Sequence, residues 1–155
     1  MGSGKVFCII GGLAALLGTF LFSFVNPAPG ISFYGIGLFL NLIDIFTSGD
    51  ILGIVITVVI LIFTFAGVFI LIGIKSRGLA IVGSLFAILL SVYILLVFIL
   101  SLPAEFSQYV VVFLEFDIVD GIIPLAVPVG NLSLGTYLLL GGGVLGLIGG
   151  IIGPD

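Results

Sequence analysis

The sequence predicts an all-α membrane protein, a four-transmembrane-helix bundle with both termini in the cytoplasm. Three long apolar runs contain no charged residue, and a fourth run follows directly after Lys5. As helices, these runs are long enough to cross the roughly 30 Å hydrocarbon core of a bilayer. The predicted spans are residues 6–25, 51–74, 79–102 and 134–152 of a single integral membrane domain covering residues 1–155.

The distribution of charge predicts the orientation of these spans. The chain is 62% hydrophobic and only 6% charged, whereas soluble proteins are about one quarter charged. The only cations, Lys5, Lys75 and Arg77, fall on one side of the four-span layout. Six of the seven carboxylates fall on the other side: Asp44, Asp50, Glu105, Glu115, Asp117 and Asp120. Because cytoplasmic loops are enriched in Lys and Arg, we expect a cell-membrane protein with a cytoplasmic Lys75–Gly78 turn.

The first run also has the basic start and apolar stretch of a signal peptide. It is longer than a typical signal-peptide core, and the following Asn26-Pro27-Ala28-Pro29 is a poor cleavage site. We therefore interpret it as a retained span.

Residues 31–48 form an apolar segment with a thin polar stripe. The stripe residues are spaced by three and four, which places them on one face of a helix. They are Tyr34, Gly37, Asn41, Asp44 and Ser48. This pattern predicts an extracytoplasmic helix lying in the membrane interface, and a re-entrant segment packed among the spans is the alternative.

Residues 109–129 show the period-2 pattern of an extracytoplasmic β-hairpin. One parity is uniformly apolar, with Val110, Val112, Leu114, Phe116 and Ile118. Asp120-Gly121 supplies a two-residue turn signal, and Pro124 and Pro128 blunt one edge of the return strand. The apolar parity is a candidate protein interface. An irregular apolar loop that caps the bundle is the alternative.

Small residues at four-residue spacing predict close helix packing, because a missing side chain lets two helices approach in lipid. The candidates are Gly142, Gly146 and Gly150 in the fourth span, Gly83, Ala87 and Ser91 in the third, and Gly11 with Ala15 in the first. These faces are expected either to pack inside one bundle or to meet another subunit.

The missing residue types exclude several chemistries. The chain has no His and a single Cys, so His- and Cys-based zinc, haem and catalytic arrangements are not expected. No Asp, Glu, Lys or Arg lies within the second, third or fourth span, where proton or ion-coupled transport would ordinarily place one. Cys8 is read as a packing residue, with acylation as the alternative. Asn131 begins an Asn-Leu-Ser glycosylation pattern, and calcium binding by the outer carboxylates stays open.

The sequence therefore predicts a non-enzymatic protein without catalytic, metal or cofactor residues. Its expected role is that of a structural or accessory subunit of a membrane assembly, acting through its Gly-rich helix faces and apolar outer loops. Its expected partners are the lipid bilayer and other membrane chains or copies of itself, and nucleic acid is not expected with three cations. The alternatives are an accessory subunit of a respiratory or other energy-converting complex, and an oligomeric pore or transporter. Such a pore would be lined by Ser84, Ser91, Thr57, Thr64 and Tyr93.

Overall fold

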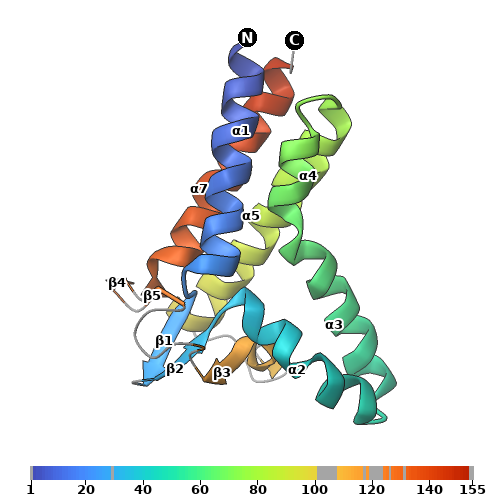
Figure 1. The fold of residues 1–155 in the computed structure, drawn as a ribbon, viewed down its shortest axis with the longest axis vertical. Coiled ribbons are helices and arrows are strands. Elements are labelled where there is room, and N and C mark those ends of the chain that lie inside the picture. The colour runs from blue at the N-terminus through green and yellow to red at the C-terminus, as the bar shows by residue number, and fades with distance from the viewer. Residues whose placement is uncertain are drawn as a thin grey trace.

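The computed structural model describes residues 2–28, 30–100, 108–116, 118, 124–125, 127–130 and 132–153. The described chain is mostly helical, with short strands gathered at the end opposite the two termini (Figure 1). The N-terminal half contains α1 (Ser3–Leu16), the π-helical η1 (Leu17–Leu21), β1 (Val25–Ala28), β2 (Ile31–Phe33), α2 (Gly35–Thr47), α3 (Ile51–Thr64) and α4 (Ala66–Ile72). The C-terminal half contains α5 (Arg77–Ile99), the 3₁₀-helical η2 (Gln108–Phe113), β3 (Leu114–Phe116), β4 (Pro128–Val129), β5 (Leu132–Ser133) and α7 (Leu134–Ile152).

Three helices in the described chain are long and apolar enough to cross a membrane. They are Ser3–Leu21 with 19 residues, α5 with 23 and α7 with 19. The pair α3–α4 makes a fourth candidate, with a bend of 42° between its two parts. The chain thus has the helix content and lengths of an all-α membrane protein with three or four spans.

The helix α7 covers the same residues as the fourth predicted span, whereas the other helices differ from the predicted spans at one or both ends. The first helical segment ends at Leu21 rather than near residue 25, because Val25–Ala28 pairs as a strand with β2. The third begins at Arg77, where the Ser76 hydroxyl accepts a hydrogen bond from the Leu79 N–H and caps the helix.

The second predicted span is broken at Phe65, which has φ −87° and ψ 10°. The break follows Thr64, whose hydroxyl donates to the Leu61 carbonyl 2.6 Å away and competes with the helical hydrogen bonds. Beyond the break, α4 packs beside α1 and α5, whereas α3 diverges from α1 and contacts α5 and α2 (Figure 1).

The segment predicted as a helix over residues 31–48 begins as a strand. Ile31–Phe33 forms β2, which pairs antiparallel with β1 on one side and β3 on the other. A local ladder with β1 and a long-range ladder with β3 thus override the apolar run there. The helix α2 starts only at Gly35, after extended Tyr34, and ends at Thr47.

The predicted strand at the start of the 109–129 hairpin is wrong. Residues 108–113 form the 3₁₀ helix η2, and only Leu114–Phe116 is extended. Side chains three apart align in a 3₁₀ helix, so Val110 and Phe113 are both buried, at 4% and 0% exposure. The strand β3 pairs with β2, not with the predicted return strand, and β4 pairs with β5. The predicted Asp120-Gly121 turn lies outside the described residues.

Candidate functional site

A seam of facing glycines joins α1–η1 to α7. A methyl group added to Gly11 would lie 2.6 Å from the Gly142 carbonyl oxygen, and one added to Gly142 would lie 2.5 Å from the Gly11 carbonyl oxygen. The same relation joins Gly4 with Gly149 and Gly18 with Gly135. The spacing on both helices is seven residues, which is the repeat that keeps two helices in contact along a left-handed seam.

The predicted four-residue ladder of α7 is divided between several neighbours. Gly142 faces α1, where the backbone of the fully buried Ala15 also lies against it. Gly146 faces the Ser84 hydroxyl and the Ile70 side chain, and Gly150 faces Ile81. These contacts place the ladder inside the chain, where its three glycines face different neighbouring helices.

The small residues predicted on α5 are also inside the chain. Gly83 lies against α4, because an added methyl group would be 2.7 Å from the Phe69 Cβ atom. Ala87 and Ser91 are fully buried, and Gly143 of α7 packs near Ala87. The small-residue faces therefore meet other helices of this chain, which leaves other surfaces to meet a partner.

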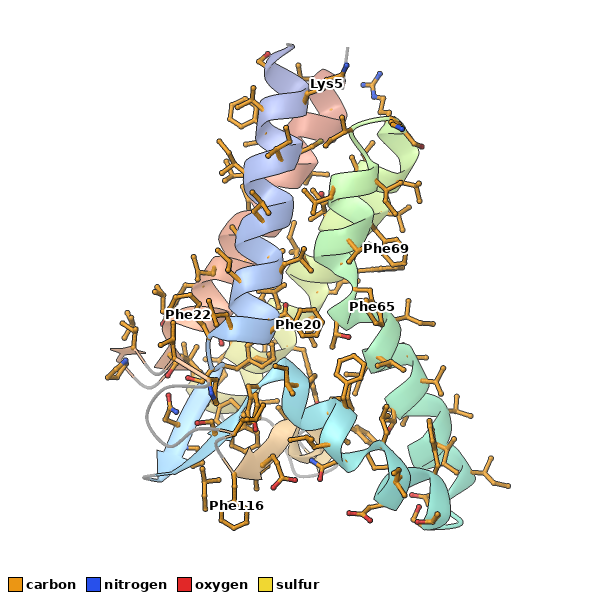
Figure 2. The ribbon with its side chains drawn as sticks, in the orientation of Figure 1. Lys5, Phe20, Phe22, Phe65, Phe69 and Phe116 are labelled. Carbon is orange, nitrogen blue, oxygen red and sulfur yellow. The ribbon has the colours of Figure 1, made fainter. Side chains whose placement is uncertain are left out.

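The five interface candidates of the outer segment do not share one face. Val110 is buried, Val112 and Leu114 are partly buried, and Phe116 and Ile118 are exposed at 69% and 50%. Figure 2 shows the Phe116 ring pointing away from the protein at the end opposite Lys5. The exposed apolar tip thus consists of Phe116 and Ile118, and the buried residue that the pattern missed is Phe113.

The first part of the polar stripe, Tyr34 to Asn41, faces the protein, whereas Asp44 and Ser48 are exposed. Tyr34, just before the helix, is fully buried, and its hydroxyl donates to the Phe116 carbonyl at 2.6 Å. The Asn41 amide donates to the Val112 and Leu114 carbonyls, both at 3.0 Å. These donors satisfy carbonyl groups of η2 and β3 that β2 does not bind.

The opposite face of α2 is apolar and exposed. Leu40, Ile43 and Phe46 are 50%, 75% and 45% exposed. This arrangement is the reverse of a water-facing surface helix, and it fits a helix whose outer face contacts lipid. Ile51 and Leu52 at the start of α3 continue this apolar surface, at 77% and 62% exposure.

A buried polar cluster ties the end of the first span to the start of the last. Asn26 accepts hydrogen bonds from the hydroxyls of Ser23 and Ser133, and its amide donates to the Ser32 hydroxyl at 2.6 Å. The three serines are at most 1% exposed. The Ser133 N–H also donates to the Phe24 carbonyl at 2.8 Å. The sequence marks Asn26 only as part of a Pro-containing loop, and nothing in it reveals these distant partners.

An open cavity of about 480 Å³ lies between α2, the start of α3, η2 and β3. Its lining is Asn41, Asp44, Ile45, Ser48, Asp50, Gly53, Thr57, Tyr109, Val112 and Leu114. Two of the predicted outer carboxylates, Asp44 and Asp50, thus line the same cavity. Within the described residues, no three side chains of the types Asp, Glu, Cys and His come together as a metal site. Asp117 and Asp120 lie outside those residues.

The hydroxyl groups proposed as a pore lining are turned into the helices that carry them. Ser84, Ser91 and Thr57 donate to carbonyls four residues earlier, and Thr64 to one three residues earlier. Each is at most 2% exposed. Tyr93 is partly buried. These serines and threonines therefore offer no polar surface to a passage between copies of the chain.

Cys8 is fully buried against Gly149 of α7, which is the packing role expected for it.

The glycosylation candidate Asn131 lies outside the described residues. The third residue of its pattern, Ser133, is buried with its hydroxyl bound to Asn26.

Comparisons with models of protein families, with curated proteins and with solved structures find no match to this chain.

Proposed function

We propose that this chain is a non-enzymatic, multi-pass protein of the cell membrane that serves as a structural or accessory subunit of a membrane assembly. In this proposal the bent α3–α4 pair crosses the membrane once, which gives four spans, and both termini are cytoplasmic. The partner is another membrane chain or a second copy of this one.

The distribution of charge along the bundle supports this orientation. Lys5 lies near the end of the bundle that holds both termini (Figure 2). Arg77 lies there too, and its guanidinium donates to the Ile151 carbonyl at 2.6 Å, near the C-terminal end of α7. Asp44 and Asp50 flank the α2–α3 turn, at the other end (Figure 1). Cations at the cytoplasmic end satisfy the positive-inside bias.

The exposed apolar tip, formed by Phe116 and Ile118, carries the assembly proposal. The tip lies at the end of the molecule that holds the strands, beside the carboxylate of Glu115. An aromatic ring that is 69% exposed there loses favourable apolar burial unless another chain covers it. The glycine faces are already covered within the chain, so the outer tip is the favoured surface for a partner.

Replacing Phe116 by Asp tests the proposal. We expect Phe116→Asp to weaken the native complex by more than about 2 kcal/mol, because a covered site would lose apolar contact and gain an unsolvated charge. The measurement is the native complex recovered in mild detergent, divided by the total membrane-inserted protein. Phe116→Leu is the matched control, since it keeps an apolar side chain at the same position.

Equal recovery of the Phe116→Asp and parent complexes would refute the assembly role of the tip. The composition of the recovered complex then separates the classes of assembly. Cofactor-bearing chains in it would identify an energy-converting complex, and copies of this chain alone would identify self-assembly.

A further inference from the structure

The outer cavity has the size and lining of a site for an amphiphilic molecule. Its volume of about 480 Å³ falls within the roughly 300–1,000 Å³ of small-molecule sites. Ile45, Val112 and Leu114 supply apolar wall, and Tyr109 supplies an aromatic ring. Its walls include α2 and the start of α3, whose outer faces carry the exposed apolar residues described above.

The polar part of the lining favours a positive charge. Asp44 and Asp50 both line the cavity. Asp44 lies in the last turn of α2, where the negative end of the helix dipole adds to the potential of its carboxylate instead of opposing it. Asp50 is the N-cap residue of α3, where the positive end of that helix dipole already stabilises its carboxylate. Asp44 is therefore the carboxylate that gains most from a cation.

The chain itself supplies no cation at this place. Lys75 belongs to the turn between α4 and α5, and Arg77 contacts the last turn of α7, at the other end of the bundle (Figure 1). Lys5 lies at that same distant end (Figure 2). A cation at Asp44 has to come from outside the chain.

We propose that this cavity binds a bilayer lipid whose headgroup carries an ammonium group. The ammonium group lies at the carboxylates of Asp44 and Asp50, where the Tyr109 ring adds a cation–π surface. One acyl chain lies against Ile45, Val112 and Leu114. The inference rests on the proposed membrane placement of α2 and α3, because only that placement brings a lipid to the opening.

Two photoreactive lipids that differ only in the headgroup test the proposal. The full chain is reconstituted in phosphatidylglycerol vesicles with a small fraction of either phosphatidylethanolamine or phosphatidylglycerol that carries a diazirine in one acyl chain. We expect the ethanolamine lipid to label peptides from residues 41–57 and 109–114 about fivefold more than the glycerol lipid does, the ratio expected for one partly exposed charge pair. Labelling of α1 and α7 is expected to be equal for the two lipids.

Variants of the carboxylates complete the test. Asp44→Asn combined with Asp50→Asn is expected to remove the headgroup preference. Glu115→Gln, which alters a carboxylate of β3 that does not line the cavity, is expected to keep it. Val112→Phe fills the cavity with a ring and is expected to reduce labelling by both lipids without altering the charge.

Equal labelling of the cavity by both lipids, or a preference that survives the double variant, would overturn the proposal. This result differs from a failure of the assembly role. The double variant leaves Phe116 unchanged, so the native complex is recovered normally when only the lipid site is lost. Conversely, if recovery of the complex is unchanged by Phe116→Asp, the assembly role fails, but the headgroup preference of the cavity is still expected.

Discussion

The Ser133 hydroxyl donates a hydrogen bond to the side-chain oxygen of Asn26, 107 positions earlier in the chain. This bond joins β1, the strand that follows the first helical segment, to the residue that precedes α7. Two backbone bonds lie beside it, from Ser133 N–H to Phe24 and from Gly135 N–H to Ser23. The first turn of α7 therefore finds acceptors for its free N–H groups in the loop that ends the first span.

Removing the Asn26 side chain is expected to destabilise the fold. Asn26→Ala leaves the buried hydroxyls of Ser23 and Ser133 without the oxygen to which they donate, at a cost of about 1–3 kcal/mol for unsatisfied groups. The measurement is the free energy of unfolding in mixed micelles. Ser48→Ala removes an exposed hydroxyl and serves as the control. Equal stabilities of the two variants would show that the Asn26 cluster contributes nothing.

The glycine seam is expected to reject a large side chain only on its inner face. Gly142→Leu forces a side chain against the Gly11 carbonyl oxygen, a backbone atom that cannot rotate away. We therefore expect its stability to fall by about 3 kcal/mol. Gly141 has no neighbouring atom within 4 Å of an added methyl group. Gly141→Leu is therefore expected to be nearly silent. Thermal unfolding in detergent compares the pair, and similar losses for both would contradict the seam.

Gly146→Leu is expected to cost less than Gly142→Leu. The atoms nearest to an added methyl group at Gly146 belong to the side chains of Ser84 and Ile70, which have freedom to shift. We expect its stability to fall by about 1–2 kcal/mol, which is within the range for an overpacked core. The same unfolding measurement applies, and a loss larger than that of Gly142→Leu would show that backbone approach does not set the cost.

The proposed orientation predicts opposite labelling of two exposed helix ends. A cysteine at Thr47 should react with a membrane-impermeant maleimide added to intact cells, and one at Gly78 should react only after the membrane is opened. Both positions are exposed, and the native Cys8 is fully buried, so the parent chain serves as the blank. Labelling of position 78 but not of position 47 in intact cells would show that the topology is the opposite of the one proposed.

The apolar outer face of α2 is expected to contact acyl chains. A fluorophore on a cysteine at position 43 should be quenched more strongly by nitroxide-bearing phosphatidylglycerol, a lipid without an ammonium group, than one at position 44, which lines the cavity. Neighbouring positions share the same depth along the helix but point to different sides. Equal quenching would mean that α2 has no lipid-facing side.

The long apolar runs made the helical membrane class predictable from the sequence. Length and hydropathy are local properties, so α7 was located to the residue and the other spans to within a few residues. The break at Phe65 was not predictable, because no Pro or Gly stands at that position. It coincides with Thr64, whose hydroxyl bonds within its own helix, and with the rings of Phe20 and Phe39 that pack on Phe65.

The outer end was predicted less well, since its structure depends on distant partners. The alternation of Val110 to Ile118 indicates a strand, yet η2 forms where both Val110 and Phe113 reach the interior. The stripe that contains Asn41 was identified as one helical face. Whether that face meets water or protein depends on the Val112 and Leu114 carbonyls, about 70 residues away in the chain.

The glycine seam joins the first helix of the chain to the last. During synthesis α1 reaches the bilayer before α7 exists, so the grooves beside Gly4, Gly11 and Gly18 have no partner of their own for most of that time. A contact between residues so far apart is slow to form, and an open small-residue groove in lipid accepts any helix of similar surface. We therefore expect correct assembly to require that the glycine groove of α1 stays free until α7 has been inserted.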